Sequence, residues 1–101
     1  MKLALRSNTL TYLPDATKSL QNLVSLDLSD NLLTALPAFF GTAFPHLAVL
    51  ELRNNLLAAA DLPKDVSGLA RSLKSLNLSG NRLTLIPPQL YELTGHRQFF
   101  L

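Results

Sequence analysis

The amino-acid sequence predicts an α/β solenoid: a right-handed β-α superhelix with parallel strands on its concave face and short helical or irregular segments on its convex face. Three observations lead to this prediction. About a quarter of the 101 residues are leucine, which indicates a core built by using one side-chain shape many times. A spaced pattern of leucines that includes an asparagine recurs along the chain, and a Leu-Pro or Ile-Pro pair follows each copy.

The repeated pattern is L-x-x-L-x-L-x-x-N-x-L, and complete copies begin at Leu23, Leu47 and Leu73. A fourth copy is already under way at the start of the chain, where Leu3 and Leu5 fill the later leucine positions. The asparagines of the four copies are separated by 23, 24 and 26 residues (31 − 8, 55 − 31 and 81 − 55). These separations lie within the roughly 20–29 residues typical of one class of solenoid repeat. The asparagines are Asn8, Asn31, Asn55 and Asn81.

A proline follows the asparagine of each copy. Pro14, Pro37 and Pro87 come at the same distance, each directly after a leucine or isoleucine, whereas Pro63 arrives two residues late. The third repeat is therefore lengthened on its return segment.

The strand of each repeat is predicted from alternation. In the second copy Leu26 and Leu28 are two residues apart and share one face of a strand, whereas Ser25, Asp27 and Ser29 share the other. One repeat cannot bury such a leucine stripe alone, so successive repeats must stack, with parallel strands about 4.8 Å apart.

The return segments are predicted on the opposite side of the coil, and because they are wider than the strand spacing the array must curve with the strands inside. Residues 16–22 and 64–72 are expected to hold a helical turn or two, and residues 37–44 and 88–93 to be 3₁₀ or irregular. Three aromatic residues are predicted to fill the core behind the second strand, with a ligand pocket as the alternative. They are Phe39, Phe40 and Phe44.

These motifs resemble the leucine-rich repeat family along essentially the full length of the chain. The variant is the one with a Leu-Pro pair after the asparagine and L-x-x-L before the next strand, as in residues 90–93, and it is typical of intracellular members. The resemblance implies a leucine-rich repeat solenoid in the cytoplasm. It also implies a structural, non-catalytic asparagine ladder, in which amides pair with backbone groups from one repeat to the next. The ladder positions are Asn8, Asn31, Asn55 and Asn81.

The domain prediction is a single array over residues 1–101. It comprises a partial repeat 1–22, repeats 23–46, 47–72 and 73–95, and a partial repeat 96–101, whose strand turns Phe99 and Leu101 inward. Neither end carries the polar capping repeat that an array needs. The sequence therefore predicts a piece of a longer array, and an isolated chain that is marginally stable or associates with itself through its open edges.

The residues between the inward leucines are predicted to line the concave binding face. Asp27 and Glu51 fall on neighbouring strands and would repel one another, and Arg53 lies diagonally from Asp27 and would offset it. The alternative is a solvated, self-compensating surface with no binding role. The candidates for partner binding are Arg6, Asp27, Glu51, Arg53 and Asn77.

Composition argues against other classes of function. Nine basic and seven acidic residues are dispersed, so no basic stripe for nucleic acid is predicted, and no apolar run approaches the roughly 20 residues that span a membrane. Cysteine is absent, glycines form no phosphate loop, and His46 and His96 are isolated, so we expect no metal, cofactor or enzymatic activity. The glycosylation sequon at residues 77–79 is interpreted as incidental.

The sequence therefore predicts a non-catalytic module that binds another protein on its concave face. Two alternatives remain open at this point. One is a substrate-recognition segment of a larger assembly such as a ubiquitin-ligase adaptor, and the other is the sensor domain of an enzyme or receptor whose catalytic part lies outside this chain.

Overall fold

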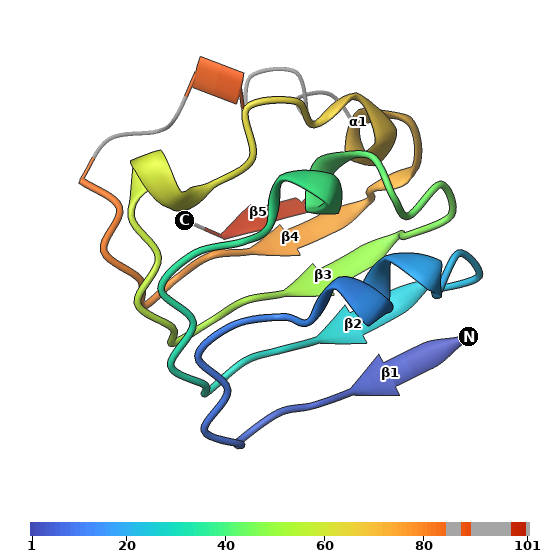
Figure 1. Ribbon diagram of the computed structural model, residues 1–101. Coiled ribbons are helices and arrows are strands. Elements are labelled where there is room, and N and C mark those ends of the chain that lie inside the picture. Colours follow the sequence, from blue (N-terminus) through green and yellow to red (C-terminus); the bar gives the residue numbers. More distant parts are fainter. Residues whose placement is uncertain (85–87, 90–97, 101) are drawn as a thin grey trace.

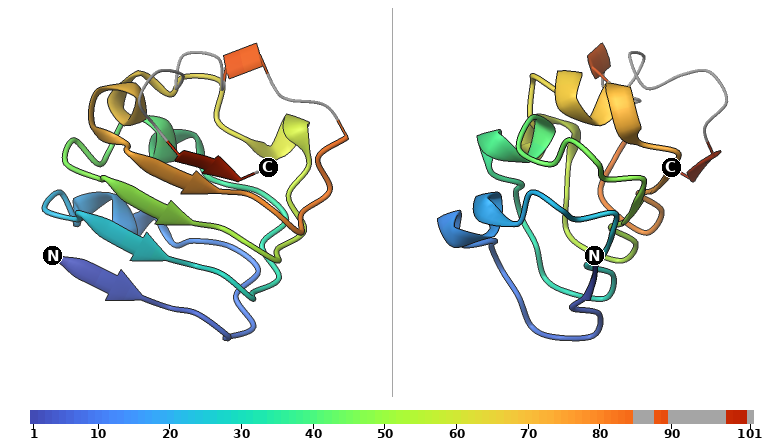
Figure 2. Two further views of the ribbon diagram at one scale, coloured as in Figure 1. Left: turned by 180° about the vertical axis from the view of Figure 1, so that it is seen from behind. Right: turned by 90° about the vertical axis from the view of Figure 1, so that its right-hand side faces the viewer.

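The computed structural model describes residues 1–84, 88–89 and 98–100, the last three by their backbone. Its strands form one parallel sheet in the order β1-β2-β3-β4-β5, so each strand neighbours the next in the chain (Figure 1). Figure 2 shows the return segments gathered on the side away from the sheet. The predicted α/β solenoid is confirmed. The strands are β1 Lys2–Ala4, β2 Ser25–Asp27, β3 Val49–Glu51, β4 Ser75–Asn77 and β5 Gln98–Phe100.

The strands pair without stagger. Leu3, Leu26, Leu50, Leu76 and Phe99 occupy one register line across the sheet. The two extra residues of the third repeat therefore leave the register of β4 unchanged and are accommodated on the convex side. The register also aligns two surface columns, namely Lys2, Ser25, Val49, Ser75 and Gln98, and Ala4, Asp27, Glu51, Asn77 and Phe100.

The convex side is built from single turns. Within the predicted return segments, Ala38–Gly41 is a 3₁₀ helix (η2) and Ser67–Ser72 is an α-helix (α1), as expected. The first segment also holds the expected helical turn, in the form of a 3₁₀ helix, η1 Asp15–Ser19, that starts directly after Pro14. Thr17 donates its backbone N–H to the Pro14 carbonyl, which closes a three-residue turn. No described helix is long and apolar enough to cross a membrane.

The lengthened third repeat contains a further 3₁₀ turn, η3 Ala59–Asp61, which was not predicted. The Asp61 carboxylate accepts a hydrogen bond of 2.9 Å from the Ala58 backbone N–H and so closes the start of this turn. The return segment predicted at residues 88–93 lies mostly outside the described residues. Leu101, which was predicted to turn inward, lies outside them as well.

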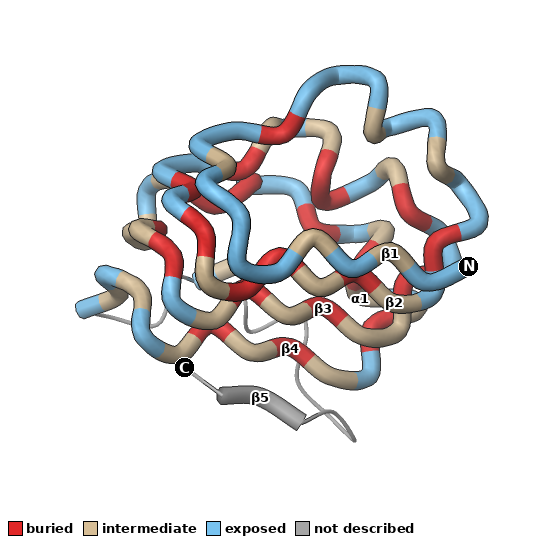
Figure 3. The backbone as a smooth tube through the Cα atoms, turned by 90° about the horizontal axis from the view of Figure 1, so that it is seen from below, coloured by how far each residue is buried: buried red, intermediate tan, exposed pale blue. Residues whose placement is uncertain are grey.

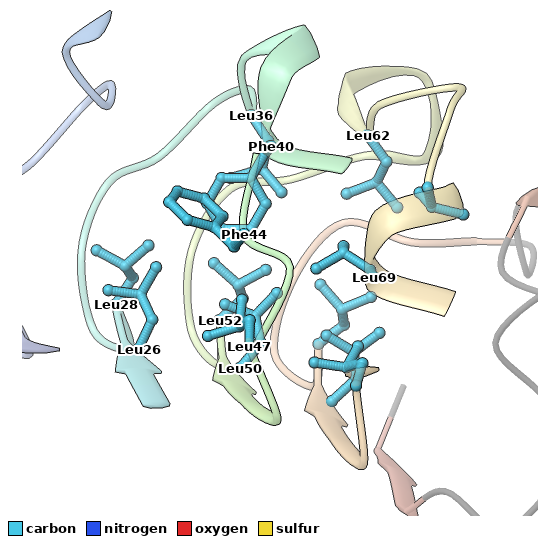
Figure 4. Packing of buried hydrophobic residues seen from close by; sticks show 14 of the residues in the cluster. Leu26, Leu28, Leu36, Phe40, Phe44, Leu47, Leu50, Leu52, Leu62 and Leu69 are labelled. Atoms are coloured by element: carbon cyan, nitrogen blue, oxygen red, sulfur yellow. The ribbon is translucent and has the colours of Figure 1, made fainter. Parts of the chain in front are cut away.

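The core follows the leucine pattern. β2, β3 and β4 each have one buried residue between two partly exposed ones (Figure 3). Phe40 and Phe44 are fully buried and meet edge to face with ring centroids 5.2 Å apart, whereas Phe39 is only partly buried. Core packing is therefore confirmed for Phe40 and Phe44. The buried side chains come from successive windings and close the interior continuously (Figure 4).

The core contains a small apolar cavity. An apolar cavity of about 20 Å³ lies between the second, third and fourth windings, beside η2 and α1, and is bounded by leucines, Phe40, Pro63 and Val66. With no polar group in its wall, a cavity of this size offers a water molecule nothing to bind and stays dry.

Candidate functional site

A turn with left-handed backbone ends each strand segment. The residue directly before each repeat asparagine has a positive φ: 60° at Ser7, 58° at Asp30, 59° at Asn54 and 73° at Gly80. Glycine adopts this conformation without strain, and Asp and Asn tolerate it better than most residues. The turn redirects the chain inward, so the asparagine that follows can reach the interior.

Asn55 shows what the inward asparagines do. Its Nδ2 donates to the Leu52 carbonyl of its own winding and to the Leu28 carbonyl of the preceding winding, both at 3.0 Å. Its Oδ1 accepts a hydrogen bond of 3.1 Å from the Leu33 backbone N–H. The side chain is 3% exposed. One buried amide thus satisfies backbone groups of two windings that no strand ladder reaches.

Asn31 and Asn81 repeat this arrangement. Each donates to a carbonyl of its own winding and to one of the preceding winding at 2.8–3.0 Å, and each accepts from a backbone N–H of the preceding winding. Asn8 differs, because it is exposed and, within the described part of the chain, binds the Leu5 and Arg6 carbonyls of its own winding alone. The physical reason is its position after the edge strand β1, which has no strand beyond it in the sheet.

A second set of polar side chains, Arg6, Asp30 and Asn54, is linked at the surface outside these amides. Arg6 Nε lies 3.2 Å from Asp30 Oδ2, and Asn54 Nδ2 donates to Asp30 Oδ1 at 2.8 Å. The hydrogen bond from Asn54, followed by that from Arg6, holds the pKa of Asp30 below its ordinary value. Arg6, a predicted partner-binding residue, is thereby committed to an ion pair within the chain. Sequence reasoning missed Asp30 and Asn54, although the run of residues tolerant of positive φ before each asparagine was a usable signal.

On the concave face, Asp27 and Asn77 are engaged in matching ways. Asp27 Oδ1 accepts from the backbone N–H of Ser29 at 3.0 Å and from its hydroxyl. Asn77 Oδ1 does the same with Ser79, at 3.0 and 2.6 Å. Each side chain closes the bend that follows its strand. Ser29, which the sequence placed on the outer face beside Asp27, is 2% exposed, whereas Ser79 in the matching bend is partly exposed.

Glu51 and Arg53 behave differently from their neighbours. Glu51 pairs in register with Asp27, as predicted. Among the described residues, the Glu51 carboxylate and the Arg53 guanidinium form no hydrogen bond and no ion pair. Asp27 is held by Ser29, and Arg53 makes no ion pair with it among the described residues, so the predicted offset could act only through space. The Nε of Arg53 is buried and has no acceptor in the described part of the chain.

The described residues hold no group of three potential metal ligands. His46 is exposed, and His96 lies outside the described residues. Asn77, the sequon residue, has its side-chain oxygen committed to Ser79.

Comparison with known proteins agrees with this architecture. The sequence profile described as leucine rich repeat matches residues 1–57 and again residues 21–83. The chain is 41% identical to mouse leucine-rich repeat-containing protein 58 over 96 residues, which covers 92% of this chain and 26% of that protein. The lengthened third repeat and its exit, residues 61–81, resemble that protein. The chain is also 37% identical over 83 residues to human leucine-rich repeats and immunoglobulin-like domains protein 3, which covers 80% of this chain and 7% of that protein.

Proposed function

Because the chain belongs to the leucine-rich repeat family, whose domains generally mediate protein–protein interactions, we propose that it is a non-catalytic module that binds a partner protein on its concave face. The observation that carries the proposal is the contrast among the polar groups of this face. Asp27 and Asn77 are committed to the chain itself, whereas the charges of Glu51 and Arg53 are left without partners among the described residues.

The geometry of the face supports the same proposal. The unstaggered register aligns Lys2, Ser25, Val49 and Ser75 in one column, so neighbouring side chains stand about 4.8 Å apart on a continuous surface. A stable interface usually needs about 800 Å² on each partner. The described strands supply part of that area. The chain spans about a quarter of leucine-rich repeat-containing protein 58, so the proposal concerns this segment and not the partners of a whole protein.

A test compares the two sides of the coil. A photo-crosslinking amino acid is placed at Ser75 on the concave face, or at Thr42, an exposed residue next to η2 on the convex side. Proteins crosslinked from Ser75 are identified and purified, and their affinity is measured for the wild-type chain and for Glu51→Ala/Arg53→Ala.

We expect crosslinks from Ser75 but not from Thr42, and about tenfold weaker binding by the double variant, since two charged contacts are lost. Lys18→Ala/Lys64→Ala, which changes two exposed convex residues, is the matched control and should bind normally. Equal crosslinking from both sides, or unchanged affinity of the concave variant, would remove the concave face from the proposal.

A further inference from the structure

The Arg53 side chain lies partly buried against the protein without being paired among the described residues. Its Nε is buried, so the side chain lies against the protein and does not extend freely into solvent. The residue as a whole is partly exposed, and the terminal guanidinium nitrogens are not among the buried, unsatisfied atoms of the described residues. They are thus presented to an incoming group. A long side chain whose stem already packs against the protein loses less conformational entropy when it binds.

The nearby carboxylates do not neutralise Arg53 by direct contact. The charge of Arg53 contributes to the lowered pKa of Asp30, but the two oxygens of Asp30 are bound by Arg6 and Asn54. Asp27 is held by Ser29. Glu51, two residues before Arg53 on the same strand segment, lies beyond ion-pair distance. Arg53 is therefore a preorganised cation without a counter-ion in contact among the described residues.

We propose that Arg53 anchors a side-chain carboxylate of the bound protein. This inference rests on the proposed function and names the chemistry of the partner: a segment with an acidic residue over Arg53. A planar guanidinium binds a carboxylate through two parallel hydrogen bonds, which makes the contact directional as well as electrostatic.

The surroundings of Arg53 select a single negative charge. Asp27 and Glu51 sit in register on adjacent strands of the same face, so a doubly charged phosphate bound there would be repelled by two carboxylates more strongly than a singly charged group. A carboxylate meets less repulsion, and a basic residue beside it in the same segment would lie over the Asp27–Glu51 pair. The complementary segment therefore carries an acidic and a basic side chain side by side.

The experiment uses a phage-displayed library of random linear 12-residue peptides, selected in parallel on the wild-type chain, on Arg53→Gln and on Arg71→Gln. Arg71 is exposed on α1, on the convex side, and serves as the matched control. We expect peptides selected on the wild type and on Arg71→Gln to be enriched in Asp and Glu over the starting library. They should bind Arg53→Gln about tenfold more weakly. Circular dichroism melting of each variant checks that the fold is retained.

Equal acid content and equal affinity of peptides selected on the wild type and on Arg53→Gln would overturn the inference. Tighter binding of a peptide after phosphoserine replaces its acidic residue would also overturn it, in favour of a phosphate ligand. Val49→Trp, which places a bulky neutral group in the concave column, separates this failure from that of the proposed function. Peptides whose affinity is unchanged by Arg53→Gln but is lost on Val49→Trp would overturn only the role of Arg53 as an anchor. Peptides unaffected by Val49→Trp, or a selection that yields none, count against concave-face binding itself.

Discussion

Asn54 donates a hydrogen bond of 2.8 Å to Asp30, which joins two successive windings through residues that both have left-handed backbone. The bond lies outside the buried asparagines and ties the turns to one another at the surface. Asp30 also receives Arg6 from the winding before it, so its carboxylate bridges three windings.

The first prediction concerns the titration of Asp30. Its pKa in the folded chain lies below the ordinary value of 3.8, first because of the hydrogen bond from Asn54. Asn54→Ala should raise this pKa toward 3.8, as followed by NMR of the side-chain carboxyl carbon. Because the folded pKa is depressed, the stabilisation is complete above pH 3.8 and is lost as the pH falls through the folded pKa. The pKa of Asp65, lowered by hydrogen bonds from Ser67, is the internal control and should not move.

The second prediction concerns the inward amides. Asn55→Ala leaves the Leu33 N–H and buried carbonyls without partners and should cost roughly 1–3 kcal/mol of unfolding free energy. Asn8→Ala removes an exposed side chain bonded only within its own winding, so its cost should stay within about 0.5 kcal/mol. Urea unfolding of both variants measures these free energies. Equal losses of unfolding free energy would contradict the expectation that the buried amide matters more than the exposed one.

The third prediction concerns Gly80. A Cβ at this position would lie 2.1 Å from Asn54 Oδ1, on a backbone with φ of 73°. Gly80→Ala should therefore cost about 1–2 kcal/mol for the left-handed conformation, and more while Asn54 is present. A double-mutant cycle with Asn54→Gly measures the contact, since Gly80→Ala should be cheaper in that background. Additive losses would show that Asn54 moves aside freely.

The fourth prediction concerns the apolar cavity. Val66 lines it, and Val66→Ile adds one methylene where empty space exists. We expect a gain of up to about 0.8 kcal/mol, read from the urea midpoint. Leu69→Ala, which enlarges the same cavity, should cost roughly 2–5 kcal/mol. Destabilisation by Val66→Ile would mean that the cavity has the wrong shape for the added group.

The fifth prediction concerns the edge strand. Met1 and Leu5 bond toward β2, so by alternation the N–H of Ala4 points away from the sheet. We predict that the isolated chain associates through this edge, and that Ala4→Pro weakens association by removing the outward donor. Sedimentation velocity over a concentration series tests this. A wild-type chain that remains monomeric throughout, with a sharp reversible melt, would refute the prediction.

The strands and their register were predictable because burial imposes a strict pattern on leucine. Leu26, Leu50 and Leu76 align across the sheet although unequal numbers of residues separate them. Ser29 shows where this reasoning stops. The alternation predicts an exposed residue after buried Leu28, yet Ser29 is buried, whereas Ser79, in the matching bend closed by Asn77, is partly exposed.

The partners of the charged side chains were harder to foresee. Arg6 and Arg53 occupy equivalent positions in their repeats, yet Arg6 pairs with Asp30 whereas Arg53 has no acceptor for its Nε in the described chain. Arg6 meets Asp30, the residue before the asparagine of the next winding, whereas the equivalent residue after Arg53 is Gly80, which has no side chain to offer.

The unshifted pairing of β3 with β4 across the longest repeat has a consequence for how such chains diversify. Glu51 still meets Asn77, although two added residues and η3 intervene on the return path. An insertion on the convex side of the coil can thus leave the strand register of the concave face unchanged. Natural variation or deliberate grafting can remodel one side while recognition by the other is inherited intact.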